Sequence, residues 1–307
     1  MHTSGLHHVT AIASDPQANR DFYEGVLGLR LVKQTVNFDD PGTLHLYYGD
    51  GLGSPGTILT FFPIPGLTPG SAGVGVTERV ALAVPPGALP AWRERLAAAG
   101  IAAANSAAGL AVRDPDGLAL ELVESAEVVS STPWTARTAP AMAIQGIAGV
   151  HLASAAATST ARAVTDWLGL SDHGAGVFRA DPALGGSVTV RDAAGDARTR
   201  RGAGVVHHIA FRAAGGEEQL QWLDHLRRQG AVPTPVQDRE YFTSIYFMEP
   251  GGVLFEIATN GPGFARDEAP DALGARLCLP PWFEEHRALL EERLPRLAPA
   301  PPVGVGA

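Results

Sequence analysis

The chain is poor in cysteine and in clustered positive charge. Cys278 is the only cysteine among 307 residues. This excludes an internal disulfide and fits a protein of the reducing cytoplasm. No long run of lysine and arginine occurs, and the formal net charge is −9. Both features argue against a nucleic-acid partner and against binding to an anionic membrane surface.

Long apolar runs and an N-terminal leader are also missing. No uninterrupted apolar stretch is long enough to cross a bilayer. The first strand-like run begins within a few residues of Met1, which leaves no room for a signal peptide. We therefore expect a cytoplasmic protein, long enough for two domains. Aromatic residues are sparse, at 7%, so the sequence does not map an aromatic pocket.

The sequence does contain one unit that is repeated four times. Each copy has a strand-like run, a helical run that stops at a glycine, and two or three further strand-like runs. The period is about seventy residues, and the copies begin near Gly5, Glu78, Gly146 and Val205. The glycines that should end the four helices are Gly28, Gly100, Gly169 and Gly230. In copy one, Asp15 is placed to cap the helix.

The repeats divide the chain into predicted domains. Residues 1–125 hold two units and residues 143–262 hold the other two. Residues 126–142 between them are rich in Ser, Thr, Pro and Ala and are typical of a linker. Residues 263–307 form a predicted helical tail, with a last helix over 283–294. One βαβββ unit cannot cover both sides of its own sheet, so we expect the units to pair and leave a concave cleft between them.

Two His-His dipeptides and one glutamate are the candidates for chemistry. His7-His8 opens the first strand-like run of copy one, His207-His208 opens that of copy four, and Glu256 lies in the last run of copy four. Strand side chains alternate between faces, so only one histidine of each pair can face a given cavity. In copy four the bulkier residues should pack on the helix, which leaves His208 and Glu256 facing the cleft. Two imidazoles and a carboxylate can form a facial metal triad with open coordination positions.

The third ligand has two candidates. His151 matches His208 by position in copy three, and Glu121 matches Glu256. If copies three and four share a cleft, the triad is His151, His208 and Glu256. If copies one and four pair, His8 replaces His151. In that case we expect the buried Glu121 of the other cleft to hydrogen-bond His151.

These features resemble the vicinal oxygen chelate superfamily, the group of glyoxalases and extradiol dioxygenases, over most of residues 4–262. Within it, the chain resembles the ring-cleaving dioxygenases that act on hydroquinones. The segments that carry the resemblance are GLHHVT at 5–10, FYEGVLGL at 22–29, and the stretch from DREYF at 238–242 through SIYF at 244–247 to Glu256. The resemblance implies an α+β fold of four tandem βαβββ modules, which pair into two open, half-barrel-like sheets with a concave metal cleft.

The resemblance also implies a ligand set and a group of catalytic residues. The hydroquinone group uses the histidine of the first copy, so we predict His8, His208 and Glu256 as metal ligands. Fe(II) is the expected metal, because three ligands leave room for a substrate oxygen and O₂, although Mn(II) or Zn(II) could bind the same set. The predicted catalytic residues, near the substrate, are Arg239, Tyr246 and His207.

Two of these roles depend on strand geometry. Tyr246 lies on the same face as Glu256 only if the connecting loop has three or five residues, or if a bulge intervenes. His207 faces away from His208 in a regular strand, so its role requires a twist or a bulge. The remaining histidines are expected to be surface or packing residues: His45, His173, His225 and His286.

We therefore predict an Fe(II)-dependent, extradiol-type ring-cleaving dioxygenase of hydroquinones or catechols, with a small aromatic diol and O₂ as substrates. One alternative is a metal-dependent glyoxalase or isomerase. Such enzymes typically take a ligand from each final strand, whereas the segment 57–62 has neither carboxylate nor amide. The other alternative is a metal-free small-molecule-binding protein of the same fold, which would not retain the histidines and the glutamate. The sequence leaves open the ring substituents and whether copies of the chain form a homo-oligomer.

Overall fold

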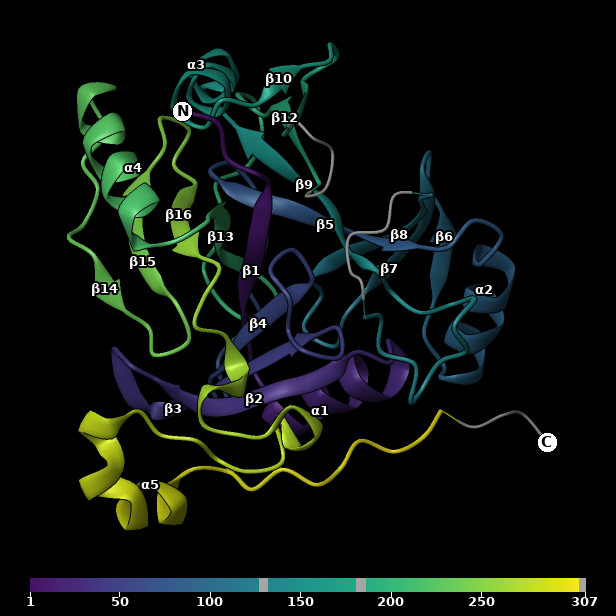
Figure 1. Ribbon diagram of the computed structural model, residues 1–307. Coiled ribbons are helices and arrows are strands. Elements are labelled where there is room, and N and C mark those ends of the chain that lie inside the picture. The colour runs from purple at the N-terminus through teal and green to yellow at the C-terminus, as the bar shows by residue number, and fades with distance from the viewer. Residues whose placement is uncertain (127–131, 181–185, 304–307) are drawn as a thin grey trace.

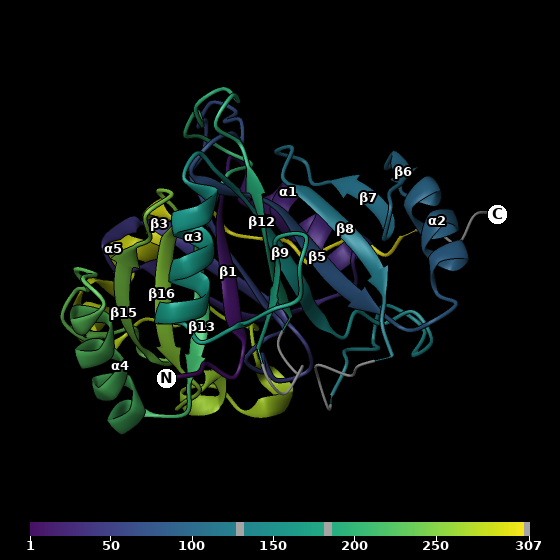
Figure 2. The same cartoon turned by 90° about the horizontal axis from the view of Figure 1, so that it is seen from above.

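The computed structural model describes residues 1–126, 132–180 and 186–303, and two eight-stranded sheets make up most of it (Figures 1 and 2). The first sheet has the order β14 (Gln237–Asp238), β15 (Thr243–Met248), β16 (Leu254–Thr259), β13 (Val206–Ala213), β1 (Leu6–Ala13), β4 (Ile58–Pro63), β3 (Asp40–Gly49) and β2 (Arg30–Asn37). The second has the order β10 (Ser171–Asp172), β11 (Val177–Arg179), β12 (Ser187–Asp192), β9 (Gly146–Ser154), β5 (Val76–Val84), β8 (Ala119–Glu124), β7 (Gly109–Arg113) and β6 (Ala103–Asn105).

Each sheet joins two repeat units through their first strands. In the first sheet β1 of copy one pairs antiparallel with β13 of copy four, and in the second β5 of copy two pairs antiparallel with β9 of copy three. The predicted α+β fold of paired βαβββ modules is therefore confirmed. Each sheet draws on both halves of the chain, so the predicted domain limits, 1–125 and 143–262, stay a prediction. The predicted linker, 126–142, lies partly outside the described residues, at 127–131.

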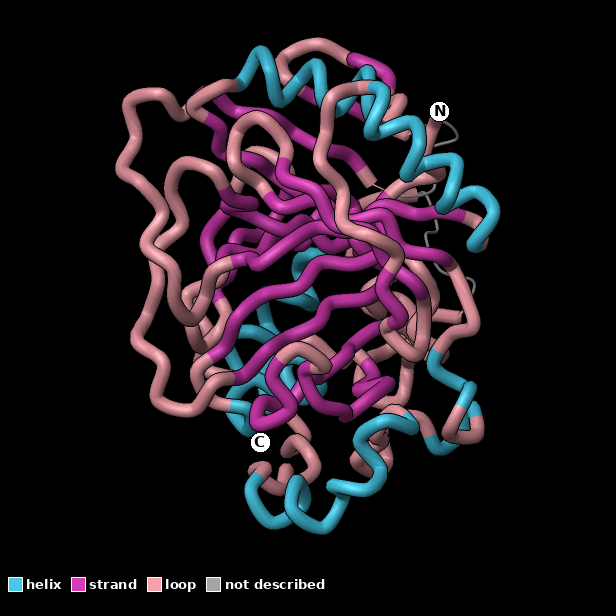
Figure 3. Tube along the Cα trace, turned by 90° about the vertical axis from the view of Figure 1, so that its left-hand side faces the viewer, coloured by secondary structure: helices cyan, strands magenta, loops and turns pink. Residues whose placement is uncertain are grey.

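Helices lie outside the strands, which occupy the middle of the molecule (Figure 3). The helices of the four units are α1 (Pro16–Arg20) with a π-helical end (Asp21–Val26), α2 (Leu89–Ala98), α3 (Ala157–Arg162) with a π-helical end (Ala163–Trp167), and α4 (Gly216–Arg228). The glycines predicted to end them all have positive φ, with 71° at Gly28 and 85° at Gly230. The Asp15 carboxylate caps α1 by accepting from the N–H groups of Gln17 and Ala18.

The chain after β16 returns along the β2–β3 edge of the first sheet (Figure 1). It contains short 3₁₀ turns (Phe264–Arg266, Pro270–Ala272, Pro281–His286) and α5 (Arg287–Arg293). The predicted continuous helix over 283–294 is wrong in its first turn, which is 3₁₀ and follows two prolines. Leu290 and Leu294 are buried, whereas Leu289 is 45% exposed on the outer side. No helix among the described residues is both long and apolar enough to cross a membrane.

Candidate metal centre

Both His-His dipeptides lie at irregularities where β1 pairs with β13. The register shifts between Leu6 and His8 on β1, and again where Thr10 pairs with His208 and Ala11 pairs with Val206. The first histidine of each dipeptide therefore has no partner residue, as in a β-bulge. The predicted role of His207 required a twist or a bulge, and the structure has a bulge there. It lets both histidines of one dipeptide approach the same region.

The structure brings His8, His208 and Glu256 together. The Nε2 atoms of His8 and His208 are 3.2 Å apart. They lie 3.2 and 2.9 Å, respectively, from Oε2 of Glu256. All three side chains are buried, and Glu256 is fully inaccessible. The pairing of copies one and four, and not of copies three and four, creates this cluster.

The three atoms fit a metal ion by distance and by chemistry. Neighbouring ligands on an ion at about 2.1 Å are roughly 3 Å apart, which is close to the observed separations. Glu256 Oε2 is buried without a hydrogen-bond partner, although an imidazole nitrogen of each histidine lies close to it. Its other oxygen, Oε1, accepts from the hydroxyl of Ser244. A buried carboxylate oxygen left unpaired calls for a ligand.

Electrostatics favour the ligand forms of these side chains. Burial alone would raise the pKa of Glu256, but the adjacent His8 and His208 hold that pKa well below its usual range. Burial lowers the pKa of His208. At neutral pH the glutamate is therefore a carboxylate and His208 is a neutral imidazole. These are the protonation states that bind a metal cation.

The far nitrogens of both histidines are held by their sequence neighbours. Nδ1 of His8 lies 2.9 Å from Nδ1 of His7, and Nδ1 of His208 lies 2.8 Å from Nδ1 of His207. His7 also contacts the carbonyl oxygen of Thr259 through Nε2, at 3.1 Å. Contacts of this kind fix the orientation and tautomer of a ligating imidazole. The two bulges thus support the two imidazoles in the same way.

Thr60 occupies the position in copy one that corresponds to Glu256 in copy four. On β4 it pairs with Thr10, two residues after His8, just as Glu256 pairs with Ala210, two residues after His208. Its hydroxyl contacts the hydroxyl of Thr10 at 3.0 Å. The cluster therefore has three ionisable side chains that can bind a metal. Where a fourth such ligand would lie by repeat position, the chain has the hydroxyl of Thr60.

His45 is a residue of this site that sequence reasoning missed. It was expected on the surface or in packing, but it lines the cavity beside the cluster. Its Nε2 lies 2.7 Å from the Thr60 hydroxyl, and its Nδ1 lies 2.9 Å from the hydroxyl of Tyr47. Burial lowers its pKa well below the usual value, which keeps the ring neutral. The alternation of His45 and Tyr47 on one strand was the available signal.

A cavity of about 440 Å³ opens next to the cluster. It lies between copy one, which supplies the β2–β3 hairpin, and copy four, which supplies β13 to β15. Aromatic side chains make up much of its wall: Phe38, Tyr47, Phe62, Phe242 and Tyr246. The volume suits a single small aromatic ring with room for a second small molecule. Five of the 21 Phe, Trp and Tyr residues of the chain therefore line this one cavity.

Tyr246 and Arg239 meet inside the cavity. Tyr246 pairs directly with Glu256 across β15 and β16, because the loop 249–253 has five residues and so puts both on one face. Arg239 donates from Nε to the Tyr246 hydroxyl at 3.1 Å and pairs with Asp39 of the opposite hairpin at 3.1 Å. Arg239 also donates to Gln237 at 2.6 Å. His207, which is more exposed, lies at the rim of the same cavity.

The second cleft has a different composition. His151 and Glu121 lie in the second sheet, on β9 and β8. Glu121 Oε2 is 3.3 Å from an Arg79 nitrogen but 4.0 Å from His151 Nε2. The expected hydrogen bond between Glu121 and His151 is therefore wrong, because the Arg79 guanidinium compensates the buried carboxylate in its place.

Comparison with known proteins agrees with this architecture. Residues 5–122 and 129–257 match the family model described as "Glyoxalase/Bleomycin resistance protein/Dioxygenase superfamily". The chain therefore belongs to that superfamily, which confirms the resemblance inferred from its motifs.

Within the superfamily, relatives that match over nearly the full length are named as dioxygenases. The chain is 45% identical over 300 residues to "Putative ring-cleaving dioxygenase MhqO" of Bacillus subtilis, covering 95% of this chain and 96% of the relative. It is 33% identical over 304 residues to "Chlorohydroquinone/hydroquinone 1,2-dioxygenase" of Sphingobium indicum, covering 91% and 92% of the two chains.

Solved structures show the same fold. A crystal structure of a "putative dioxygenase" from Bacillus subtilis is 43% identical and superposes with a TM-score of 0.92, covering 97% of this chain and 98% of that one. Glyoxalase I from Zea mays is only 13% identical, with a TM-score of 0.62 over 83% of this chain and 92% of that one. That second likeness supports the fold alone.

Proposed function

We propose that the protein is a metal-dependent dioxygenase that cleaves the ring of a hydroquinone or a catechol with O₂. In this proposal His8, His208 and Glu256 hold Fe(II), for which Mn(II) could substitute. The observation that carries it is the cluster of three buried ligand atoms, with the unpaired Oε2 of Glu256 among them. The names of the full-length relatives support the reaction class and the hydroquinone substrate.

When bound, the metal would supply an electron-accepting centre that lowers the pKa of a coordinated phenol and brings the substrate and O₂ together. The protein then has to orient the ring. The aromatic wall of the cavity packs against its faces, and the β2–β3 hairpin limits its position. Arg239, fixed by Asp39 and Gln237, directs its charge at the Tyr246 hydroxyl.

Tyr246 serves as a proton donor in this proposal. Burial and the negative charge of Glu256 raise its pKa, so the hydroxyl stays protonated at neutral pH. It can therefore donate a hydrogen bond to an oxygen of the substrate, where a tyrosinate could not. His207 lies between the cavity and solvent, a position from which it can relay a proton and support His208 at the same time.

The proposed cleavage incorporates both atoms of O₂. The bond between a hydroxyl-bearing ring carbon and its neighbour breaks, and each of these carbons gains one oxygen atom of O₂. A hydroquinone that is cleaved beside an unsubstituted carbon gives one carboxylic acid and one aldehyde. The neutral substrate therefore becomes an anion once the acid loses its proton near its usual pKa.

Anaerobic purification tests this proposal. We expect about one iron per chain, as a facial triad requires, and stoichiometric oxygen uptake with methylhydroquinone. Stoichiometric zinc, with no activity after reconstitution with Fe(II) or Mn(II), would contradict it. The isomerase alternative is not supported, because Thr60 takes the place of a fourth charged ligand. We also propose a cytoplasmic location, on the ground of the lone Cys278.

A further inference from the structure

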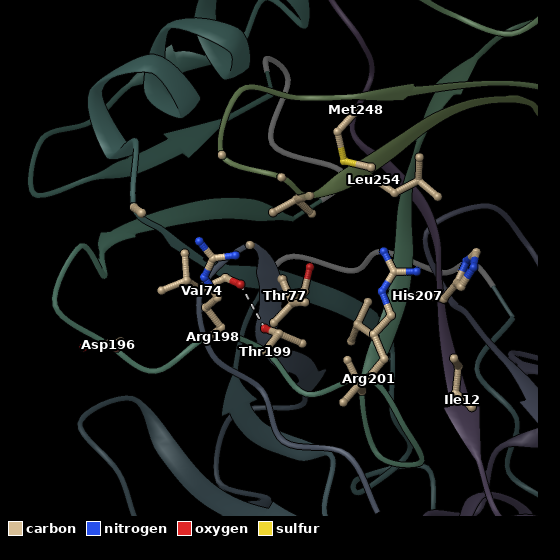
Figure 4. A pocket seen from close by; sticks show the side chains of 18 of the residues that line it. Ile12, Val74, Thr77, Asp196, Arg198, Thr199, Arg201, His207, Met248 and Leu254 are labelled. Carbon is tan, nitrogen blue, oxygen red and sulfur yellow. Dashed lines mark hydrogen bonds between the residues drawn. The ribbon is translucent and has the colours of Figure 1, made fainter. Parts of the chain in front are cut away.

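A second cavity opens beside the metal centre. Its volume is about 610 Å³, larger than the 440 Å³ of the cavity at the cluster. The two cavities share part of their lining, namely Ile12, His207 and Leu254. Figure 4 shows the imidazole of His207 at one end of the larger cavity, with the side chains of Arg198, Thr199 and Arg201 along it. A molecule in the larger cavity would therefore lie next to the metal centre.

Two paired loops build the wall that carries these arginines. The segment 68–75 runs beside the segment 197–203, with Ser71 and Arg200 exchanging backbone hydrogen bonds of 2.9 and 3.0 Å. Gly70 N–H also donates to the carbonyl of Ala203 at 2.8 Å. The hydroxyl of Thr199 accepts from Gly73 N–H. It also donates to the Val74 carbonyl (Figure 4). This ladder fixes the backbone from which the two guanidinium groups extend.

The cavity has excess positive charge. Neither Arg198 nor Arg201, both of which are exposed, forms an ion pair with a carboxylate among the described residues, whereas Arg191 pairs with Glu78 and Asp196. Asp196 is the one carboxylate in the described lining, and it pairs with Arg191 at 2.8 Å. Two guanidinium groups without a carboxylate partner favour an anionic ligand, and their planar donors suit a carboxylate.

We propose that this arginine cavity, defined by Arg198 and Arg201, binds the carboxylate of a small organic acid whose other end reaches the metal centre. The proposal rests on the proposed function for the identity of that acid. One source is the ring-opened product, which becomes a carboxylate when the two oxygen atoms are incorporated. The other is a hydroquinone that already carries a carboxyl group. Both present the same chemistry to the two arginines.

A binding experiment without turnover tests the cavity itself. The full-length protein is titrated anaerobically with cis,cis-muconate, a six-carbon dicarboxylate, by isothermal calorimetry. We expect the double variant Arg198→Gln/Arg201→Gln to bind at least about tenfold more weakly, as the loss of charged hydrogen bonds implies. The control is Arg200→Gln, which removes one positive charge from the same loop outside the cavity and should stay within about twofold of wild type.

Equal affinity in the double variant and in Arg200→Gln, or no binding to the wild-type protein, would overturn the proposal. Metal content and the thermal unfolding midpoint of the double variant check that it is folded. Because the titration needs no catalysis, it tests carboxylate binding even if no quinol is turned over. A failed turnover assay would thus contradict the proposed function and leave the test of the cavity unaffected.

Kinetics then distinguish the two sources of the carboxylate. A lower kcat/KM of the double variant for 2,5-dihydroxybenzoate, with kcat/KM for methylhydroquinone unchanged, identifies a carboxylated substrate. Weaker inhibition by the ring-opened product, with both kcat/KM values unchanged, identifies the product. If neither quantity responds in an active enzyme, the arginine cavity does not communicate with the metal centre and the proposal is wrong.

Discussion

Nδ1 of His207 lies 2.8 Å from Nδ1 of His208, and His7 stands in the same relation to His8 at 2.9 Å. In both dipeptides a bulge turns the first histidine back toward the second, although a regular strand would hold them on opposite faces. The second histidine directs Nε2 at Glu256, and the first holds its far nitrogen. Each dipeptide therefore acts as one unit, a proposed ligand together with the residue that orients it.

His207→Ala should weaken metal binding by about 10–100-fold, because the ring of His208 loses the contact that fixes it. Competition of the anaerobic protein with a chelator measures this affinity. His173→Ala, an exposed histidine far along the chain, is the control and should bind as the wild type does. Unchanged affinity in His207→Ala, combined with slow turnover, would instead assign His207 to the substrate alone.

Tyr246→Phe should keep its metal and lose turnover. The variant removes the hydroxyl that Arg239 contacts at 3.1 Å but none of the three proposed ligands. The loss of a charge-assisted hydrogen bond costs about 1.5–3 kcal/mol, which lowers kcat by about 10- to 150-fold. Metal content and steady-state kinetics with methylhydroquinone measure both effects. Wild-type rates would remove Tyr246 from the reaction.

The two candidate third ligands can be compared directly. His8→Ala leaves one imidazole and one carboxylate, too few to hold Fe(II) against water, so metal content and ring cleavage should both collapse. His151→Ala should keep its metal, since His151 lies on the second sheet and is not part of the cluster of His8, His208 and Glu256. Its cost should stay at about 1–3 kcal/mol of stability. Loss of metal in His151→Ala but not in His8→Ala would refute the ligand assignment.

Lys33 should prove essential for the attachment of the C-terminal segment. It is the only lysine of the chain and is fully buried, with Nζ 2.6 Å from Asp267 and 2.5 Å from Glu268. Lys33→Met leaves these carboxylates without a counter-charge, which should cost about 3–5 kcal/mol. Urea unfolding measures this cost, and limited proteolysis after residue 262 should accelerate. Arg287→Gln, which breaks two more exposed ion pairs, should cost less than about 1 kcal/mol.

Asp114 should make stability depend on pH between about 4 and 6. Burial raises the pKa of its carboxyl to about 6, despite hydrogen bonds from Tyr23 and from the backbone of Leu118. The folded state therefore holds a proton that the unfolded chain releases near pH 4. The stabilisation of the fold by this proton is complete below about pH 4. It is lost as the pH rises through 6, and the total loss is about 3 kcal/mol.

Asp114→Asn removes the titrating group. The difference in unfolding free energy between wild type and this variant should therefore change between pH 4 and pH 7. The wild type should become less stable relative to the variant as the pH rises. Urea unfolding of both proteins at several pH values measures this difference. A constant difference over that range would mean that Asp114 titrates near its usual pKa.

Much of the architecture could be predicted from the sequence because its signals are local. Helix-ending glycines such as Gly28 and Gly230 and the alternation around His208 report backbone conformation and strand face directly. The position of Glu256 on the face of His208 followed from the same alternation. The choice between His8 and His151 could not be made this way, because strand pairing over some two hundred residues leaves no local pattern; it came from family resemblance.

What the sequence could not supply depends on bulges and on contacts between distant segments. The approach of His207 to His208 requires an irregular strand pairing that no residue type marks. His45 appeared unremarkable because the cavity wall forms only when the β2–β3 hairpin of copy one meets copy four. The contact of Arg79 with Glu121 joins two strands of the second sheet that lie 42 residues apart, so no local pattern marks it either.

The fate of O₂ tests the central claim most directly. The anaerobic, metal-loaded protein is mixed with methylhydroquinone and ¹⁸O₂, and the ring-opened product is analysed promptly by mass spectrometry after reduction of its aldehyde, which would otherwise exchange oxygen with water. The account predicts two labelled atoms in one product molecule, one in the carboxylate and one at the former aldehyde. A product with one or no labelled atom, or quinone formation without ring opening, would contradict it.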